Sequence, residues 1–421
     1  MAPDTPIPAA EKAILRELAK RQLEISRLPV MAERKRLWIL HNRLEGKRPM
    51  VVMQGAFLKE TLPPPRCEHP LAAGMEQQMC TIIAAHEIFD DDQVVPGFFA
   101  VNFWITMDFL GLKQKRVTAA EGGLAWHIEP SFADLKEGLP LLKPSEYLYR
   151  KEKTESYAAA ARDVLGDILP VVLKNSFNHW FFTPTQHVVE LMGMENMYFA
   201  MTDEPEDFHR LMRAINDDLL RSLRWQETNG LLPLNNGNDY VASGSFGFSD
   251  ELPKPGSNAA ETGKAVSRDI WGHLNSQESI GISPDQFQEF VYPYYEELAK
   301  EFGLVYYGCC EPVHAYWDNS LSRLPNLRKI SISPWCDEDI MGEKLAGGKV
   351  IYSRKPSPNF IGIKAAFDEE AFTVHISKTA AAVKGRCKAE FVFNDIYALH
   401  GNLEKTRKAV EITRQIAETM Y

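Results

Sequence analysis

The sequence predicts an α/β protein: a single (β/α)8 barrel preceded by an N-terminal helical extension. Short apolar runs alternate with longer helical patterns about eight times, an order typical of parallel strands joined by crossover helices. The chain has 421 residues, which a closed barrel can take up as one unit. An open, doubly wound sheet is the alternative. We expect the extension over residues 1–46 and the catalytic barrel over residues 47–421.

The extension has leucine and isoleucine at nearly helical spacing, interrupted at Pro29. Because proline disrupts the interior of a helix, the pattern predicts two helices that cover part of the barrel. The positions that set the spacing are Leu15, Leu18, Leu23, Ile25, Leu28, Leu37, Leu40 and Leu44.

The barrel region is predicted from nine short apolar runs that end in polar or glycine-rich residues. These runs cover residues 48–54, 93–101, 169–176, 231–236, 268–275, 304–311, 327–335, 349–356 and 389–396. Helical patterns cover residues 185–199, 205–229, 284–302, 337–346, 367–385 and 402–420. Ser283 is the expected cap of the third helix, with Pro284 at its first position, and Asn402 is the expected cap of the last.

Two segments stand outside this alternation. Residues 234–264 are rich in Gly, Ser, Asn and Pro, and an irregular stretch of this length is typical of a lid, a binding loop or a disordered segment. The acidic run at residues 90–92 is interpreted as the solvent-exposed start of a strand rather than a metal site.

The composition excludes several classes of protein. The net charge is −10 and there is no basic stripe, which argues against nucleic-acid binding. Six cysteines are too few for a disulfide framework in a chain of this length and fit a reducing compartment. We see no signal peptide and no apolar run of the ~18–20 residues that a membrane span needs. We therefore expect a soluble cytoplasmic protein that binds no membrane, with a homodimer as one oligomeric state to test.

The most informative polar group follows the run that ends at Tyr307. Cys309, Cys310 and Glu311 stand together there, with His314 three residues further on. In a barrel this position is the catalytic rim. A thiol there can bind zinc as a thiolate, act as a nucleophile, or fill space as a small apolar group. Two thiols beside a carboxylate favour the metal.

A catalytic zinc takes ligands from several strand ends and keeps one position open. Candidate partners of the thiols are Glu278, His273, Glu311 and His314. Because successive residues of a strand point to opposite sides, at most one of the two thiols is expected to face the mouth of the barrel.

Three longer segments occur in a characteristic order: LMGMENMYFAMTDEPEDFHRLM, WGHLNSQESIGISPDQFQEFVYPYYEEL and FVFNDIYALHGNLEKTRKAV. With them, the chain from about Arg48 to its end resembles the uroporphyrinogen decarboxylase superfamily. That family has a single (β/α)8 barrel and includes zinc-dependent methyltransferases that serve corrinoid proteins. In the methyltransferase branch a His-x-Cys-Gly segment follows the fifth strand, and Tyr307-Gly308-Cys309-Cys310 lies at that place here.

The resemblance implies methyl transfer between a small methylated substrate, or a thiol, and a corrinoid such as methylcobalamin carried by a partner protein. Zinc would be the Lewis acid, with Cys309, Cys310 and Glu278 as its ligands. Glu278, Glu311 and Asp395 are the expected catalytic carboxylates. The expected substrate-binding residues are His179, Asn238, Asp239, His273, Tyr307, Lys355 and Asn394.

Two other functions remain open. One is a metal-independent decarboxylase or lyase in which Arg354, Lys355 and His179 hold a carboxylate. The other is a binding protein without catalytic activity. Zinc content distinguishes the methyltransferase from both.

Overall fold

The fold is organised around a six-stranded parallel sheet. The computed structural model describes residues 6–55, 58–113, 115–118 and 126–420. The strand order is β1–β14–β13–β12–β11–β10, and every neighbouring pair is parallel. The six strands are β1 (Met50–Met53), β10 (Trp271–Leu274), β11 (Leu304–Tyr307), β12 (Leu327–Ile332), β13 (Ile351–Arg354) and β14 (Ala389–Phe393).

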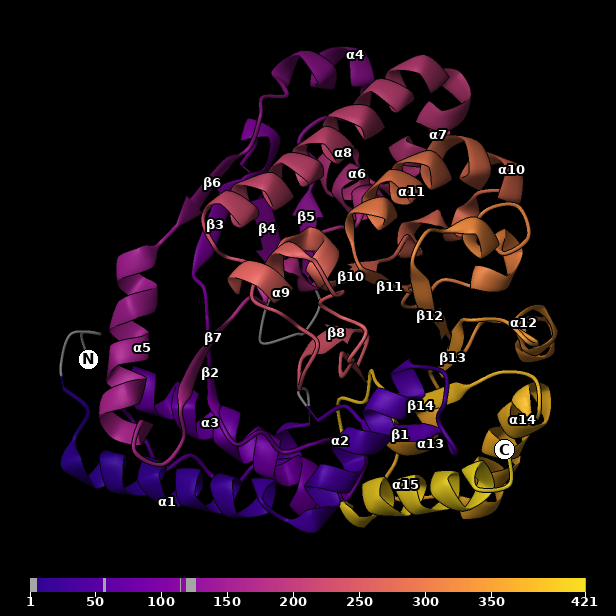
Figure 1. Cartoon of the computed structure of the whole chain (residues 1–421). Helices are drawn as coiled ribbons and strands as arrows, with labels where there is room; N and C mark the ends of the chain where they lie inside the picture. Colours follow the sequence, from indigo (N-terminus) through magenta and orange to yellow (C-terminus); the bar gives the residue numbers. More distant parts are fainter. Residues whose placement is uncertain (1–5, 56–57, 114, 119–125, 421) are drawn as a thin grey trace.

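A separate parallel pair is formed by β2 (Phe99–Asn102) and β7 (Val171–Lys174). Figure 1 shows the six strands and this pair around a central region, with the helices outside. In the described part of the chain, no backbone ladder joins the pair to the six-stranded sheet. The α/β class is confirmed and the arrangement is compatible with a barrel, but closure is not shown.

Eight of the nine predicted runs contain a strand of these two sheets. The runs are apolar because strands such as β1, β11 and β14 are buried along their whole length. The prediction for residues 231–236 is wrong, since that segment has no strand.

The helices follow the predicted patterns closely. The six patterns correspond to α6 (Pro184–Met192) with α7 (Met194–Asp203), α8 (Pro205–Thr228), α10 (Pro284–Gln286) with α11 (Tyr292–Glu301), α12 (Glu338–Lys344), α14 (Glu369–Val383) and α15 (Glu404–Ala417). The sequence prediction missed α3 (Pro70–Ala84), α5 (Lys151–Leu165) and the short α4 (Leu135–Gly138), α9 (Asn258–Thr262) and α13 (Asn359–Gly362).

One of the two expected helix caps is confirmed. The Ser283 hydroxyl accepts a hydrogen bond from the Gln286 amide at 3.1 Å, as in a capping box. Asn402 does not cap α15, because its side-chain amide donates to the Ala365 carbonyl instead.

The N-terminal residues form two helices, α1 (Ala9–Ser26) and α2 (Pro29–Asn42), with the break before Pro29 as expected. The second helix does more than cover the surface. Trp38 is fully buried and packs with Met50, Val52 and Val392 of the sheet. The extension therefore shares its core with the sheet that it precedes.

Side chains occupy both edges of the six-stranded sheet. At β1, the Asp92 carboxylate accepts the Val51 amide at 2.8 Å, and Asp91 accepts the Met53 amide at 2.7 Å. At β10, the Asn235 side chain accepts the Trp271 amide at 2.8 Å and donates to the Trp271 carbonyl at 3.0 Å. These groups stand where a further strand would pair.

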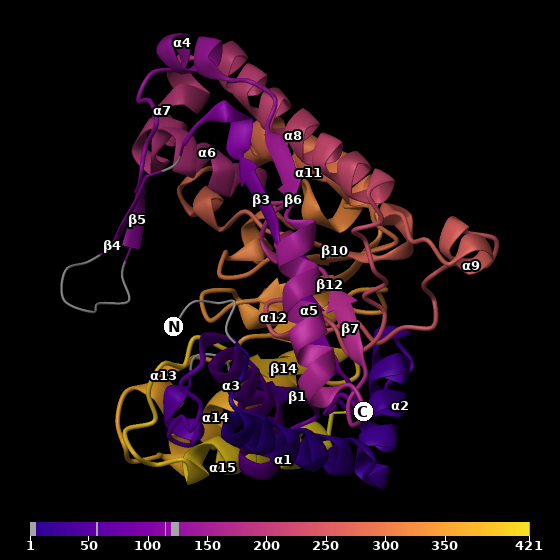
Figure 2. The ribbon, with the colours of Figure 1, turned by 90° about the vertical axis from the view of Figure 1, so that its left-hand side faces the viewer.

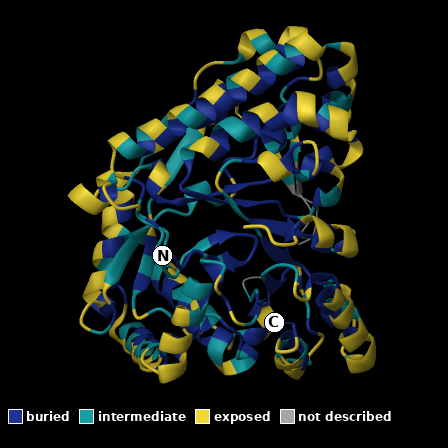
Figure 3. Cartoon of the chain, turned by 45° about the vertical axis from the view of Figure 1, so that its right-hand side comes forward, coloured by how far each residue is buried: buried dark blue, intermediate teal, exposed yellow. Residues whose placement is uncertain are grey.

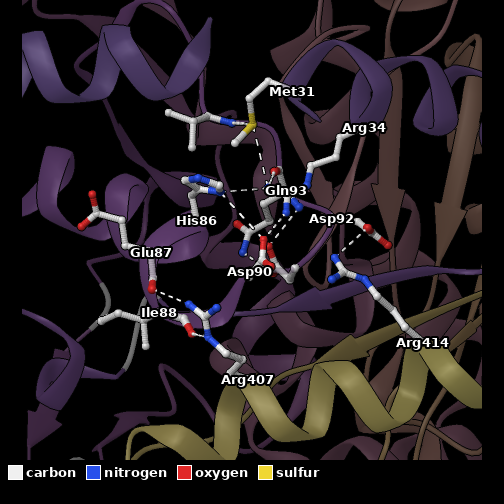
Figure 4. A network of polar contacts seen from close by, with 12 residues as sticks. Met31, Arg34, His86, Glu87, Ile88, Asp90, Asp92, Gln93, Arg407 and Arg414 are labelled. Carbon is white, nitrogen blue, oxygen red and sulfur yellow. Dashed lines mark hydrogen bonds and ion pairs between the residues drawn. The ribbon is translucent and has the colours of Figure 1, made fainter. Parts of the chain in front are cut away.

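Two residues of the acidic run, Asp91 and Asp92, are buried and not solvent-exposed as expected, whereas Asp90 is partly exposed. Asp92 forms ion pairs with Arg48 at 2.7 Å and Arg414 at 2.9 Å, and Figure 4 shows Arg414 reaching it from α15. Burial alone would raise the pKa of Asp92, but the two guanidinium groups lower it below its usual value. The compensating charges come from opposite ends of the chain.

Between β2 and β7 the chain forms two antiparallel pairs that the sequence did not predict. They are β3 (Ile105–Asp108) with β6 (Glu146–Tyr149) and β4 (Lys115–Thr118) with β5 (Trp126–Glu129). Figure 2 shows β4 and β5 extending away from the body of the molecule.

The long irregular stretch contains regular structure and lines two cavities. Part of it forms a hairpin, β8 (Tyr240–Ala242) with β9 (Ser245–Phe246), that lies at the centre of Figure 1. Gly244 has φ +88°, and a Cβ there would lie 2.3 Å from Val392 of β14. The hairpin, which we call the plug, fills space between the strands.

The burial pattern agrees with this arrangement. Figure 3 shows buried strands at the centre and helices whose outward faces are exposed. Within the described residues, no helix is long and apolar enough to cross a bilayer.

Candidate functional site

The paired cysteines lie in a turn at the carboxyl end of β11. Gly308 has φ +98°, a conformation that favours glycine, and a Cβ there would approach Ser331 to 3.1 Å. The turn places the two Sγ atoms 3.5 Å apart. Cys309 is buried and Cys310 is half-buried.

Glu311 holds this turn in place. Its carboxylate accepts the Cys309 amide at 2.8 Å and the Ser276 amide at 2.9 Å. It therefore ties the end of β11 to the end of β10. Glu311 was expected to be a catalytic carboxylate, but both of its oxygens accept backbone amides. It therefore acts as a positioning residue.

The two thiols share a proton unequally. The contact with Cys310, together with burial, raises the pKa of Cys309, whereas the hydrogen bond from Cys309 lowers the pKa of Cys310. The lower pKa of Cys310 favours its thiolate over that of Cys309, and a hydrogen bond from Cys309 would stabilise that thiolate.

A cavity of about 480 Å³ opens beside Cys309, and we call it the thiol cavity. It receives residues from the carboxyl ends of β1, β7, β11 and β14 and from the plug. Its polar and aromatic lining consists of Gln54, Thr81, Phe89, Gln93, His179, Trp180, Tyr240, Ser243, Phe246, Cys309, Asn394, Asp395 and Tyr397. Of the two thiols, only Cys309 is among the described residues that line it.

A second cavity of about 180 Å³ lies between β2, β7 and β10, and we call it the amide cavity. His179 and Tyr240 belong to both cavities. Five asparagines line the amide cavity together with Lys174, Asp239 and His273; they are Asn102, Asn175, Asn178, Asn235 and Asn238.

The two histidines are neutral at physiological pH. Burial lowers the pKa of His179 and that of His273 to about 4. His273 Nδ1 lies 2.6 Å from the His179 carbonyl oxygen. Because a carbonyl only accepts, Nδ1 carries the proton and Nε2 presents a lone pair.

A buried chain of polar groups runs between the strands next to the thiols. Lys355 Nζ donates to Tyr306 Oη at 2.6 Å and to Ser353 Oγ at 2.9 Å. Ser353 donates to Glu390 at 2.7 Å, and Lys329 pairs with the same carboxylate at 2.9 Å. We call these five residues the interior chain.

The interior chain is rich in positive charge. Burial lowers the pKa of Lys355 to about 8, although the charges of Glu390 and the two thiols oppose this shift. His41 of α2 also contacts Glu390, at 3.1 Å. Of the two ammonium groups, only that of Lys329 thus pairs with Glu390, and Lys355, which reaches that carboxylate only through Ser353, forms no ion pair among the described residues.

The structure divides the expected substrate-binding residues. Asn394 lines the thiol cavity, while Asn238, Asp239 and His273 line the amide cavity. Tyr307 lines neither, because its hydroxyl lies 2.5 Å from Ser276 Oγ. Lys355 belongs to the interior chain, with its side chain fully enclosed.

The expected carboxylates are divided as well. Asp395 lines the thiol cavity, and burial raises its pKa. Glu278 does not line either cavity; it accepts the Thr185 hydroxyl at 2.8 Å, and burial raises its pKa to about 7. Across the described residues, no group of three or more His, Cys, Asp and Glu is arranged to hold a metal ion.

Sequence reasoning missed several lining residues, including Trp180, Tyr240, Ser243 and Tyr397. Trp180 and Tyr397 follow predicted strands directly, so their position was an available signal. Tyr240 and Ser243 belong to the plug, whose inward course has no local signal.

Comparisons with known proteins add little. No family model matches the chain, and no curated protein matches it. Among solved structures, a methyltransferase from Methanosarcina mazei is similar with a TM-score of 0.49 and 10% sequence identity, over 90% of this chain and 97% of that chain. A likeness of this size carries no argument about function.

Proposed function

We propose that the chain is a methyltransferase whose reaction takes place in the thiol cavity. A methyl group would pass between a small methylated substrate, or a thiol, and a corrinoid carried by a partner protein. The observation that supports this is the pair of thiols, with Sγ atoms 3.5 Å apart, at the carboxyl end of a buried parallel strand beside a cavity. Paired sulfur donors are typical ligands of zinc.

The donor set suits zinc in type. Two sulfurs bound to one tetrahedral zinc at ~2.3 Å lie about 3.8 Å apart, close to the spacing here. Cys309 and Cys310 would hold the ion, and Asp395 offers an oxygen donor from the same cavity. Bound zinc would polarise the heteroatom of the substrate or stabilise its thiolate.

The protein's own contribution is positioning. Glu311 fixes the turn that carries both thiols. The Lys355 ammonium favours the thiolate form of Cys310, since its charge lowers the pKa of that thiol. Trp180 and Tyr397 line the thiol cavity beside the position proposed for the methyl group, and because both are partly exposed a docked partner would complete the exclusion of water.

The surface beyond the strand ends suits a protein partner. Large apolar side chains follow β7, β12, β13 and β14: Trp180, Trp335, Ile363 and Tyr397 are 39%, 65%, 61% and 52% exposed. Exposed apolar side chains near a cavity are typical of interaction surfaces. A corrinoid protein docked there would bring its cobalt to the thiol cavity.

Zinc analysis is the first test. Purified protein should contain about one zinc per chain, and the Cys309→Ala, Cys310→Ala double variant should lose it while staying folded. Cys387→Ala is the matched control, because Cys387 is also a half-buried free thiol but lies outside the thiol cavity. Metal-free wild-type protein that takes up no added zinc would contradict the proposal.

Methyl transfer is the second test. Zinc-loaded protein is mixed with cob(I)alamin and single methyl donors: methanol, methylamines, methyl thioethers and methoxyarenes. Formation of methylcobalamin, followed by absorbance, is the expected result, and it should disappear in the double variant. Transfer that is unchanged in metal-free protein would contradict the role of zinc.

A metal-independent lyase is the second candidate function, and Lys355 is the observation that favours it. Its ammonium has no ion pair among the described residues, and a substrate carboxylate that displaced Tyr306 or Ser353 from it would supply one. If metal-free protein released CO₂ from a carboxylated substrate and Lys355→Met abolished this, the lyase would be favoured over the methyltransferase.

A further inference from the structure

The amide cavity has no role in the chemistry proposed above. It adjoins the thiol cavity, sharing His179 and Tyr240 with it, but contains neither cysteine. Its walls combine apolar side chains with five asparagines, a charged pair, two histidines and Tyr240. A small enclosed space with a few fixed polar groups is typical of a ligand subsite.

Some of the polar lining is satisfied by the protein itself. Lys174 and Asp239 form an ion pair at 2.6 Å, so they contribute no net charge. The Asn235 side chain is bound through both polar atoms to the Trp271 backbone. The Asn238 amide donates to the Val94 carbonyl. These groups shape the cavity without needing a ligand.

Two buried atoms that belong to the lining residues lack a partner: Asn175 Oδ1 and His273 Nε2. The orientation of Asn175 is fixed, because its Nδ2 lies 2.7 Å from both Gln226 Oε1 and the Leu231 carbonyl, and only a donor fits there. His273 is almost fully buried, and its Nδ1 proton is used by the His179 carbonyl. The Gly308 carbonyl is a second backbone group near the ring, but the neutral ring has one N–H proton and Nδ1 has the 2.6 Å carbonyl contact. Asn175 Oδ1 and His273 Nε2 are therefore both assigned as hydrogen-bond acceptors.

Unsatisfied buried acceptors are costly unless a ligand, or an ordered water that a ligand can displace, supplies donors. An anion would meet two lone pairs. A cation would lie near the Lys174 ammonium, while the Asp239 carboxylate is already paired. The complementary group is small and neutral and carries two N–H or O–H donors.

We propose that the amide cavity binds a neutral primary carboxamide through Asn175 and His273. If the proposed function holds, this carboxamide is one end of the substrate and anchors it. The methyl-bearing end then lies in the adjoining thiol cavity. The carboxamide nitrogen would donate one proton to each free acceptor, and its carbonyl would face Lys174 or Asn178. The part of the substrate that links its two ends would lie beside His179 and Tyr240, which line both cavities.

Ligand-observed NMR with three probes tests the anchor. Acetamide has the required donors, acetate has the same shape with a negative charge, and N,N-dimethylacetamide has no donor. Acetamide should bind about tenfold more tightly than either of the others, because they leave both acceptors unpaired. Equal binding of all three, or no acetamide binding to the wild-type protein, would overturn the proposal.

Variants locate the binding. His273→Phe and Asn175→Ser should each weaken acetamide binding about tenfold, with folding checked by thermal unfolding. If one variant does not fold, the other still decides the question. Unchanged acetamide affinity in a folded variant would overturn the assignment.

The thiol variants separate this inference from the proposed function. The Cys309→Ala, Cys310→Ala variant should keep acetamide binding although it loses zinc, and His273→Phe should keep zinc. Acetamide binding by a protein that binds no zinc would sink the methyltransferase and leave the amide subsite standing. Zinc binding without acetamide binding would do the reverse.

Discussion

Buried polar groups find hydrogen-bond partners within the protein in the interior chain, but in the amide cavity some of them do not. In the interior chain, the side-chain atoms of Lys329, Ser353, Tyr306 and Lys355 meet partners within the protein, and Glu390 accepts from three of its neighbours. In the amide cavity, Asn175 and His273 each keep one acceptor without a partner. The first arrangement specifies the fold, and the second leaves room for a ligand. Variants can test whether this division holds.

The largest effect is expected for Glu390→Gln. The change leaves the buried Lys329 ammonium without its carboxylate and removes a negative charge near Lys355, so the free energy of unfolding should fall by about 3–5 kcal/mol. Urea denaturation measures it. Glu369→Gln, which removes an exposed carboxylate 3.6 Å from Lys408, is the matched control and should change stability by less than about 0.5 kcal/mol. Similar losses of stability in both variants would show that the buried Glu390 contributes no more than an exposed carboxylate.

Acid should destabilise the protein through its neutral histidines. The pKa of His273 is about 4 in the folded state against an ordinary 6.5, so the unfolded chain binds a proton first as pH falls. Stability is then lost between about pH 6.5 and 4, by up to ~3 kcal/mol for this residue. Unfolding free energies measured across that range should show a shallower slope in His273→Phe. An unchanged slope would mean that folding does not lower the pKa of His273.

Glu311→Gln should have an intermediate effect. An amide cannot accept from both the Cys309 and the Ser276 backbone, so the loss should be about 1–3 kcal/mol, with weaker zinc binding because the thiol turn shifts. Glu278→Gln is the comparison, since an amide oxygen can still accept the Thr185 hydroxyl. Denaturation and zinc titration of both variants are the measurements. If Glu278→Gln alone lost zinc, Glu278 would be the ligand that the sequence suggested.

The smallest effect is expected for Tyr306→Phe. It removes one hydroxyl from the interior chain but leaves Lys355 bonded to Ser353, so stability should fall by about 1 kcal/mol. Tyr149→Phe, on a half-exposed ring, is the control for thermal unfolding. A loss as large as that of Glu390→Gln would mean that the chain acts as one unit.

The parallel strands were predictable because burial on both faces leaves a local signal. The segment at 231–236 was misread since its apolar residues lie beside β10 while Asn235 replaces the backbone ladder. Asp92 was misread because Arg48 and Arg414, which neutralise it, are remote in sequence. Long-range compensation of this kind has no local pattern.

The turn that carries the two thiols was the part of the site that could be predicted from the sequence. The sequence placed Cys309 and Cys310 at a strand end and expected one of them to face the mouth. Which one does so depends on the backbone at Gly308, whose conformation is set by contact with β12. The division into two cavities depends on Tyr240 of the plug, and a stretch rich in Gly, Ser and Asn gave no hint of that course.

The plug also has a kinetic consequence. Phe246 of the plug lines the thiol cavity and packs with Phe248 against Trp38, whereas Tyr397, which also lines the cavity, is exposed and offers a small molecule a side to enter from. In the proposed reaction the corrinoid protein covers that same side. Turnover would then be ordered, with the small substrate bound before the protein partner and an excess of partner acting as an inhibitor.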